Sequence, residues 1–64
     1  MNNVIIHGPD GDEFNTDVYE YYANSNRLKI HNPNSDNSWI VIEDVDITID
    51  VIGFFIEISC TYRH

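Results

Sequence analysis

The clearest pattern of apolar and polar positions lies in residues 45–62. Apolar and polar side chains alternate strictly from Val45 to Val51. After Gly53 the apolar positions continue in the other phase, as Phe54, Ile56, Ile58, Cys60 and Tyr62. A period of two predicts strands with one buried face. One unbroken strand would span about 60 Å, far more than a small domain with a radius of gyration of about 11 Å allows. We therefore expect a β-hairpin or a glycine bulge near Gly53.

Shorter patterns fill the first half of the chain. Val4–His7 reads as a strand and residues 8–11 as a turn, because Pro fixes one φ angle and Gly supplies a positive one. Leu28 and Ile30 alternate with polar neighbours, which predicts a half-buried strand over residues 27–31. Three further segments complete the pattern: a polar turn at residues 23–26, a loop at 32–37 and an apolar run at 39–42.

Residues 13–22 fit two structures. A strand would place Phe14, Thr16, Val18, Glu20 and Tyr22 on one face, and Tyr19 and Tyr21 on the other. A helix would align Phe14, Val18, Tyr21 and Tyr22, with Asp12 or Thr16 as N-cap. The β-branched and aromatic content favours the strand.

Composition supports the same fold class. Ile occurs ten times, whereas Ala and Leu, the best helix formers, occur once each. We predict an all-β domain spanning residues 1–64, or an α+β domain if residues 13–24 are helical. The expected architecture is a small antiparallel sheet of four or five strands, open or closed into a barrel.

Some apolar residues are expected on the outer face of this sheet. Phe55 lies out of phase with its apolar neighbours, as Ile40 and Ile42 do with Trp39 and Val41. Such outer apolar positions favour a homodimer.

Charge narrows the class of partner. Eleven Asp and Glu face three Lys and Arg, for a net charge of −8. So acidic a chain repels nucleic acids and anionic lipids, so the favoured partner is a basic protein. Neither a signal peptide nor an apolar run of about 20 residues is present, so we expect no membrane association.

The cysteine content indicates the cellular compartment, and the amino-acid composition indicates the kind of organism that encodes the chain. The single cysteine, Cys60, cannot form an internal disulfide, which favours a reducing, cytoplasmic compartment. Its place among apolar positions predicts a buried and inert thiol. The abundance of Ile, Asn, Asp and Tyr is typical of AT-rich coding sequences, as in a low-GC bacterium or its phage.

Two groups of carboxylates are the candidate binding residues. Asp44, Asp46 and Asp50 alternate with apolar residues, at a pitch of about 6.8 Å for every two residues. That pitch is comparable with the phosphate spacing of nucleic acids, and Asp is a poor strand former. Glu43 and Glu57 extend this row, and the first turn supplies Asp10, Asp12 and Glu13. The alternatives are that these side chains provide solubility or prevent strand pairing at a sheet edge.

Aromatic side chains are the second candidate surface. Trp39, Tyr19 and Tyr21, together with Tyr22, lie on predicted strands and could anchor a protein interface or fill the core.

Signals for catalysis or metal binding are weak. Residues 32–43 follow a calcium-loop register, with Asn32, Asn34, Asp36, Ser38 and Glu43 as ligands. Only two of these ligands are charged, and the flanks read as strands. His7, His31 and His64 have no ligand-like spacing, and no motif supports Ser59 or Cys60 as a nucleophile. We expect no enzymatic activity, no metal and no cofactor.

These features lead to two functional hypotheses. The first is a non-enzymatic acidic inhibitor, of the phage or mobile-element type, that mimics nucleic acid. It would block the basic site of a host defence protein or of a nuclease or other nucleic-acid-binding protein in the bacterial cytoplasm. The second is an interaction module that self-associates or docks through its apolar and aromatic strand surface.

Overall fold

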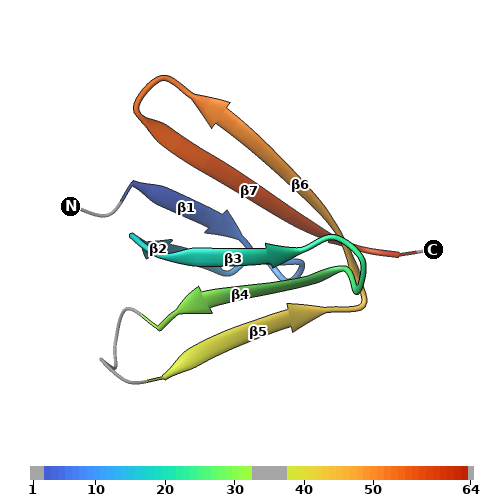
Figure 1. The fold of residues 1–64 in the computed structure, drawn as a ribbon. Helices are drawn as coiled ribbons and strands as arrows, with labels where there is room; N and C mark the ends of the chain where they lie inside the picture. Colours follow the sequence, from blue (N-terminus) through green and yellow to red (C-terminus); the bar gives the residue numbers. More distant parts are fainter. Residues whose placement is uncertain (1–2, 33–37, 64) are drawn as a thin grey trace.

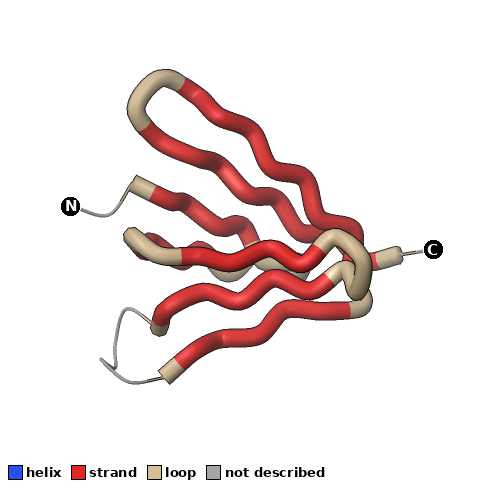
Figure 2. The backbone as a smooth tube through the Cα atoms, viewed as in Figure 1, coloured by secondary structure: helices blue, strands red, loops and turns tan. Residues whose placement is uncertain are grey.

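Seven strands in two sheets make up the computed structural model, which describes residues 3–32 and 38–63 (Figure 1). The strands are β1 (Val4–His7), β2 (Glu13–Thr16), β3 (Tyr19–Tyr22), β4 (Arg27–His31), β5 (Trp39–Glu43), β6 (Val45–Ile52) and β7 (Phe55–Tyr62). One sheet has the order β2-β1-β7-β6 and the other the order β3-β4-β5. Strands and short connections account for all the described residues, as Figure 2 shows. The all-β prediction is confirmed.

The architecture departs from a single sheet of four or five strands. Two links carry the chain between sheets: residues 17–18 lead from β2 to β3, and Asp44 leads from β5 to β6. Each link divides into two strands a segment whose sequence shows no break, so the sheets contain more strands than predicted. The sheets stay open and form no barrel. Pairing is antiparallel except between β1 and β7, which run parallel.

The core lies between the two sheets. It is formed by Val4, Ile6, Leu28, Ile30, Val45, Ile58 and Cys60, each at most 4% exposed. Strand alternation places the inner residues of β1, β6 and β7 against those of β4. Cys60 is buried as predicted, and this burial raises the pKa of its thiol.

Buried polar contacts fix both links between the sheets. Thr16, at the end of β2, is 2% exposed. Its hydroxyl lies 3.2 Å from the His31 carbonyl oxygen and 3.3 Å from the Val18 carbonyl oxygen, which share its single hydrogen, and it accepts the Val18 N–H at 3.3 Å. At the other link, the Asn26 side-chain amide donates to the Val45 carbonyl oxygen at 2.5 Å. Asn26 itself has a positive φ of 50°, as expected for Asn in a turn.

Residues 13–22 are extended, as favoured, but the link at residues 17–18 changes the phase of the alternation. Val18 is 44% exposed, while Tyr19 packs against the core. Tyr22 lies outside, opposite Arg27. The predicted grouping of Phe14 and Thr16 with Val18 and Tyr22 on one face is therefore wrong.

The predicted hairpin at Gly53 is confirmed. Ile52 pairs with Phe55 across a two-residue turn, and Gly53 has a φ of 58°. A glycine with positive φ at the first turn position, followed by a residue with negative φ, is typical of tight hairpins. Phe54 occupies the second turn position and is fully exposed, so it does not belong to the inward set of β7.

The β6–β7 hairpin projects away from the three-stranded sheet. The two sheets lie close together where β5 leads into β6, and they diverge toward the hairpin tip (Figure 1). Along the inward face of β6, exposure rises from 4% at Val45 to 77% at Val51. The described part of the chain contains no helix able to cross a bilayer.

Candidate functional site

The outer face of the four-stranded sheet gathers carboxylates from three strands. Because Ile47, Ile49 and Ile58 point inward, their neighbours Asp46, Asp50 and Glu57 point outward. Glu13 lies on the same face of β2, opposite His7 of β1. We call these four residues, Glu13, Asp46, Asp50 and Glu57, the acidic face.

Within the acidic face, the register brings like charges together. Asp50 pairs directly with Glu57 across β6 and β7, so the two side chains stand side by side. Directly opposed like charges in antiparallel strands destabilise a sheet. The acidic residue stands at position 50, opposite Glu57, although β6 has other outward positions that do not face Glu57. Thr48, two residues away, is one of them and pairs with Ser59.

Two nitrogen-bearing side chains, His7 and Arg63, lie among these carboxylates. His7 lies between two carboxylates, with Nδ1 3.7 Å from Glu13 Oε1 and Nε2 3.4 Å from Glu57 Oε2. Arg63 Nε lies 3.2 Å from Asp46 Oδ1. All these groups are substantially exposed, so the Arg63–Asp46 pair contributes at most about 1 kcal/mol, and the His7 contacts are ion pairs only when the imidazole is protonated. Asp50 remains without a basic partner among the described residues.

The turn carboxylates Asp10 and Asp12 lie near the side chain of Tyr62, at the end of β7. The Tyr62 hydroxyl donates a hydrogen bond to Asp10 Oδ1 at 2.5 Å. This bond ties the turn between β1 and β2 to the end of β7, and it raises the pKa of Tyr62. The negative charge of Asp12 raises that pKa further, so Asp12 is also close. Tyr62 is in phase with the inward residues Ile58 and Cys60, whereas Asp46 points outward, so Asp10 and Asp12 are not part of the acidic face.

Two residues of the predicted row stand apart from it. Asp44 lies in the link between the sheets, with a left-handed φ of 62°, so only Asp46 and Asp50 keep the strand spacing. Glu43 belongs to the outer face of the other sheet, where its Oε2 is 3.0 Å from Arg27 Nη2. The sequence could not show the sheet change between positions 43 and 45.

The aromatic side chains are divided between two faces. Trp39 is 40% exposed on the outer side of β5, opposite His31. Tyr19 packs against the core, and Tyr21 lies on the same inner side, opposite Leu28. Trp39 and Tyr22 are therefore the aromatic residues that the three-stranded sheet presents outward.

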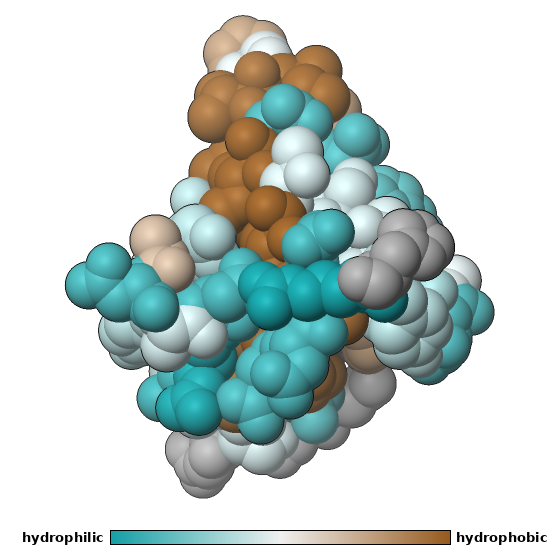
Figure 3. All heavy atoms as spheres, turned by 90° about the vertical axis from the view of Figure 1, so that its right-hand side faces the viewer, coloured by the Kyte–Doolittle hydropathy of each residue, from teal (hydrophilic) through white to brown (hydrophobic). Residues whose placement is uncertain are grey.

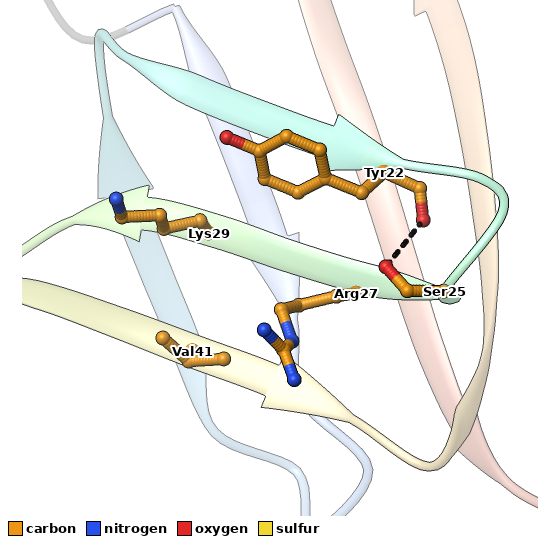
Figure 4. A pocket seen from close by; sticks show the side chains of 5 residues that line it. All are labelled: Tyr22, Ser25, Arg27, Lys29 and Val41. Carbon is orange, nitrogen blue, oxygen red and sulfur yellow. Dashed lines mark hydrogen bonds between the residues drawn. The ribbon is translucent and has the colours of Figure 1, made fainter.

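A shallow pocket on this outer face was missed by the sequence analysis. It has a volume of about 400 Å³ and is lined by Tyr22, Ser25, Arg27, Lys29 and Val41 (Figure 4). Two of the three Lys and Arg residues of the chain line it. The alternation of Arg27, Lys29 and His31 indicated an outward row on one strand. The residues of β3 and β5 that lie beside this row could be identified only once the strand order was known.

The described residues show no group of three or more His, Cys, Asp or Glu side chains arranged to hold a metal. His7 and His31 lie on different sheets. The calcium-loop register and His64 fall wholly or partly outside the described residues. Ser59 pairs with His7 in register, but both His7 nitrogens lie toward carboxylates. His7 is therefore not oriented as a general base toward Ser59.

Comparison with known proteins gives no match to a family model, to a curated protein or to a solved structure. The functional argument therefore rests on the residues of this chain.

Proposed function

We propose that the protein is a non-enzymatic inhibitor that binds the basic, nucleic-acid-binding site of another protein through its acidic face. The observation that supports this is the clustering of Glu13, Asp46, Asp50 and Glu57 on one exposed sheet surface. A nuclease or nucleic-acid-binding protein of a bacterial cytoplasm is the partner class, and a phage or mobile element is the corresponding source.

The spacing of the carboxylates supports mimicry of a phosphate backbone. Asp46 and Asp50 are four residues apart on β6, which corresponds to about 14 Å along a strand. Glu57 stands beside Asp50 on the neighbouring strand, at a strand separation of about 4.8 Å. A basic groove that neutralises several phosphates could engage these carboxylates with the same Lys and Arg side chains.

The retained like-charge pair also supports a binding role. Asp50 and Glu57 oppose one another at a cost to the stability of the sheet. A need for solubility alone would be met by charges placed anywhere on the surface. Complementarity to a basic partner gives a reason for placing two carboxylates at adjacent positions, because the partner would remove the repulsion on binding.

Charge reversal tests the proposal. The protein is tagged and incubated with nuclease-treated bacterial lysate, and captured proteins are eluted along a salt gradient. We expect a basic protein to elute at moderate salt, because exposed charge pairs are screened by ions. The Asp46→Lys/Asp50→Lys variant should then lose at least about 100-fold in affinity, as expected for close charge pairs.

The matched control is Asp17→Lys/Glu20→Lys, which changes the net charge equally outside the acidic face. It should bind within a few-fold of the unmodified protein. Circular dichroism must show that both variants fold. Equal losses in the two variants, or full affinity in the first, would contradict the proposal.

An interaction module is the second candidate, and one observation favours it. At the tip of the β6–β7 hairpin, Val51 is 77% exposed, Ile52 43% and Phe54 100%. Figure 3 shows hydrophobic atoms as a continuous strip over the part of the molecule where Figure 1 places β6 and β7. Such a strip is typical of a surface that another protein covers.

The salt dependence of binding and the effect of shortening an apolar side chain distinguish the two candidate functions. Binding through the apolar strip should barely change with salt and should be weakened by Phe54→Ser. Sedimentation velocity at several protein concentrations shows whether a second copy covers the strip.

A further inference from the structure

The pocket on the three-stranded sheet lies away from the acidic face, on the opposite side of the core. Its residues come from all three strands and one turn: Tyr22 from β3, Ser25 from the β3–β4 turn, Arg27 and Lys29 from β4, and Val41 from β5 (Figure 4). The volume of about 400 Å³ falls within the range of small-molecule sites.

Positive charge lines the middle of this pocket. Arg27 and Lys29 are two residues apart on the central strand β4, so both point outward with about 6.8 Å between their positions. Lys29 Nζ lies 4.8 Å from the centroid of the Trp39 ring. Glu20 is the register partner of Lys29 across β3 and β4, but no carboxylate in the described part of the chain lies within 4.0 Å of the Lys29 ammonium group, so its N–H groups can still contact a ligand.

Two carboxylates, Glu43 and Glu20, lie on the same outer face opposite Arg27 and Lys29, and each already accepts a hydrogen bond while keeping its charge. Glu43 Oε2 accepts hydrogen bonds from Arg27 Nε at 3.1 Å and pairs with Nη2 at 3.0 Å. The guanidinium has five N–H groups, so Nη1 can still donate to a ligand. Glu20 accepts a hydrogen bond from the Tyr22 hydroxyl, which raises the pKa of that tyrosine.

Apolar surfaces flank the cations. In Figure 4 the Tyr22 ring lies over one side of the pocket and the Val41 side chain lies on the other, with Arg27 and Lys29 between them. Tyr22 is 46% exposed and Val41 50% exposed, so both surfaces are accessible. A flat ring could stack on Tyr22 while a charged group attached to it reaches β4.

The net charge of −8 does not prevent such binding. The acidic face points away from the pocket, and two packed sheets are about 10 Å apart. At physiological ionic strength the Debye length is about 8 Å. The acidic face would repel a long polyanion that contacts much of the surface, but it is largely screened from a small anion in this pocket.

We propose that the pocket binds a planar aromatic phosphate, of which a nucleoside monophosphate is the simplest biological example. The phosphate contacts Lys29 and Arg27, and the ring packs against Tyr22 and Val41. Ser25 lies at the end of the pocket, where its hydroxyl donates to the Tyr22 carbonyl oxygen at 3.5 Å and retains lone pairs for a ribose hydroxyl. This proposal is independent of the acidic face.

Trp39 provides the signal for the test, because it is the one tryptophan of the chain and its ring contacts Lys29. Tryptophan fluorescence is followed while adenosine monophosphate is added to the intact protein in 0.15 M salt. Adenosine and inorganic phosphate are added in separate titrations. We expect saturable binding of adenosine monophosphate, at least tenfold tighter than that of either component.

Two variants with the same change in charge complete the test. Lys29→Gln should weaken binding of adenosine monophosphate at least tenfold. Arg63→Gln, on the other side of the molecule, should change it less than twofold. Binding is followed in parallel by amide chemical shifts, since Lys29→Gln also alters the surroundings of Trp39. Equal effects of the two variants, no saturable binding, or equal affinity for inorganic phosphate would overturn the proposal.

Discussion

Asp50 on β6 stands directly opposite Glu57 on β7, with no basic side chain from the described residues on Asp50. His7 lies beside Glu57 and faces Glu13 with its other nitrogen. The acidic face thus contains a local imbalance of charge at the pair of strands that forms the projecting hairpin. Stability and binding are expected to respond to this pair in opposite directions.

Removing one charge of this pair should stabilise the fold. Asp50→Asn relieves the repulsion from Glu57, and we expect the free energy of unfolding to rise by about 0.5 kcal/mol. Urea denaturation at low salt measures the change. Asp46→Asn is the matched control, because Asp46 pairs with Arg63 and its neutralisation should be neutral or slightly destabilising. The same gain in both variants would mean that net charge, and not the Asp50–Glu57 pair, determines the effect.

The hydroxyl of Thr16 should stabilise the link between the sheets. Thr16→Val keeps the shape of the side chain but removes a part-buried partner of the His31 carbonyl oxygen and of the Val18 N–H, while the Val18 carbonyl oxygen still accepts from the His31 N–H. We expect a loss of about 1–3 kcal/mol in the free energy of unfolding. Thr48→Val, on the exposed face of β6, makes the same chemical change and should alter stability by less than about 0.5 kcal/mol. Thermal unfolding of both variants decides between these outcomes.

The backbone at Asp44 gives a prediction about residue type. Its φ of 62° is tolerated by Asp, Asn and Gly but strained for a β-branched side chain. Asp44→Asn should leave stability unchanged, whereas Asp44→Val should cost about 1–3 kcal/mol. Chemical denaturation of the two variants measures the difference. Equal stability of Asp44→Val and Asp44→Asn would show that the link adopts another conformation.

The buried thiol of Cys60 makes stability depend on alkaline pH. Burial raises the pKa of Cys60 in the folded protein above its ordinary value of 9.0. A raised folded pKa stabilises the fold fully below pH 9.0, and this contribution is lost as the pH rises through the folded pKa. We expect the free energy of unfolding to fall more steeply above pH 9.0 in the unmodified protein than in Cys60→Ala. The raised pKas of Tyr22 and Tyr62 act in the same direction and are present in both proteins, so the comparison isolates the thiol.

Local periodicity predicted the strands but not their distribution between sheets. The alternation around Leu28 and Ile30 and the alternation from Val45 onward were sufficient to identify buried faces, because a strand exposes every second residue. The links at Asp17 and Asp44 are too short to leave a compositional signal. A change of one residue in phase moves all later side chains to the other face, as the position of Tyr19 shows.

The prediction of the candidate surfaces depended even more on strand pairing. The acidic residues could be named from the sequence, yet only the register places Glu13 beside His7 and Asp50 beside Glu57. The same register removes Glu43 from that group by pairing it with Arg27. The pocket around Lys29 combines side chains from β3, β4 and β5, and such a combination has no signature in a linear pattern.

The parallel pairing of β1 with β7 has a consequence for how the protein folds. Val4 is aligned with Ile56, near the opposite end of the chain, whereas β3, β4 and β5 follow one another in sequence. Closing so long a loop carries an entropy cost before any contact forms, and nonlocal pairings slow folding. The three-stranded sheet can therefore assemble early from local hairpins during synthesis. The four-stranded sheet must wait until the ribosome has released residues 55–62, so the acidic face is completed at the end of folding.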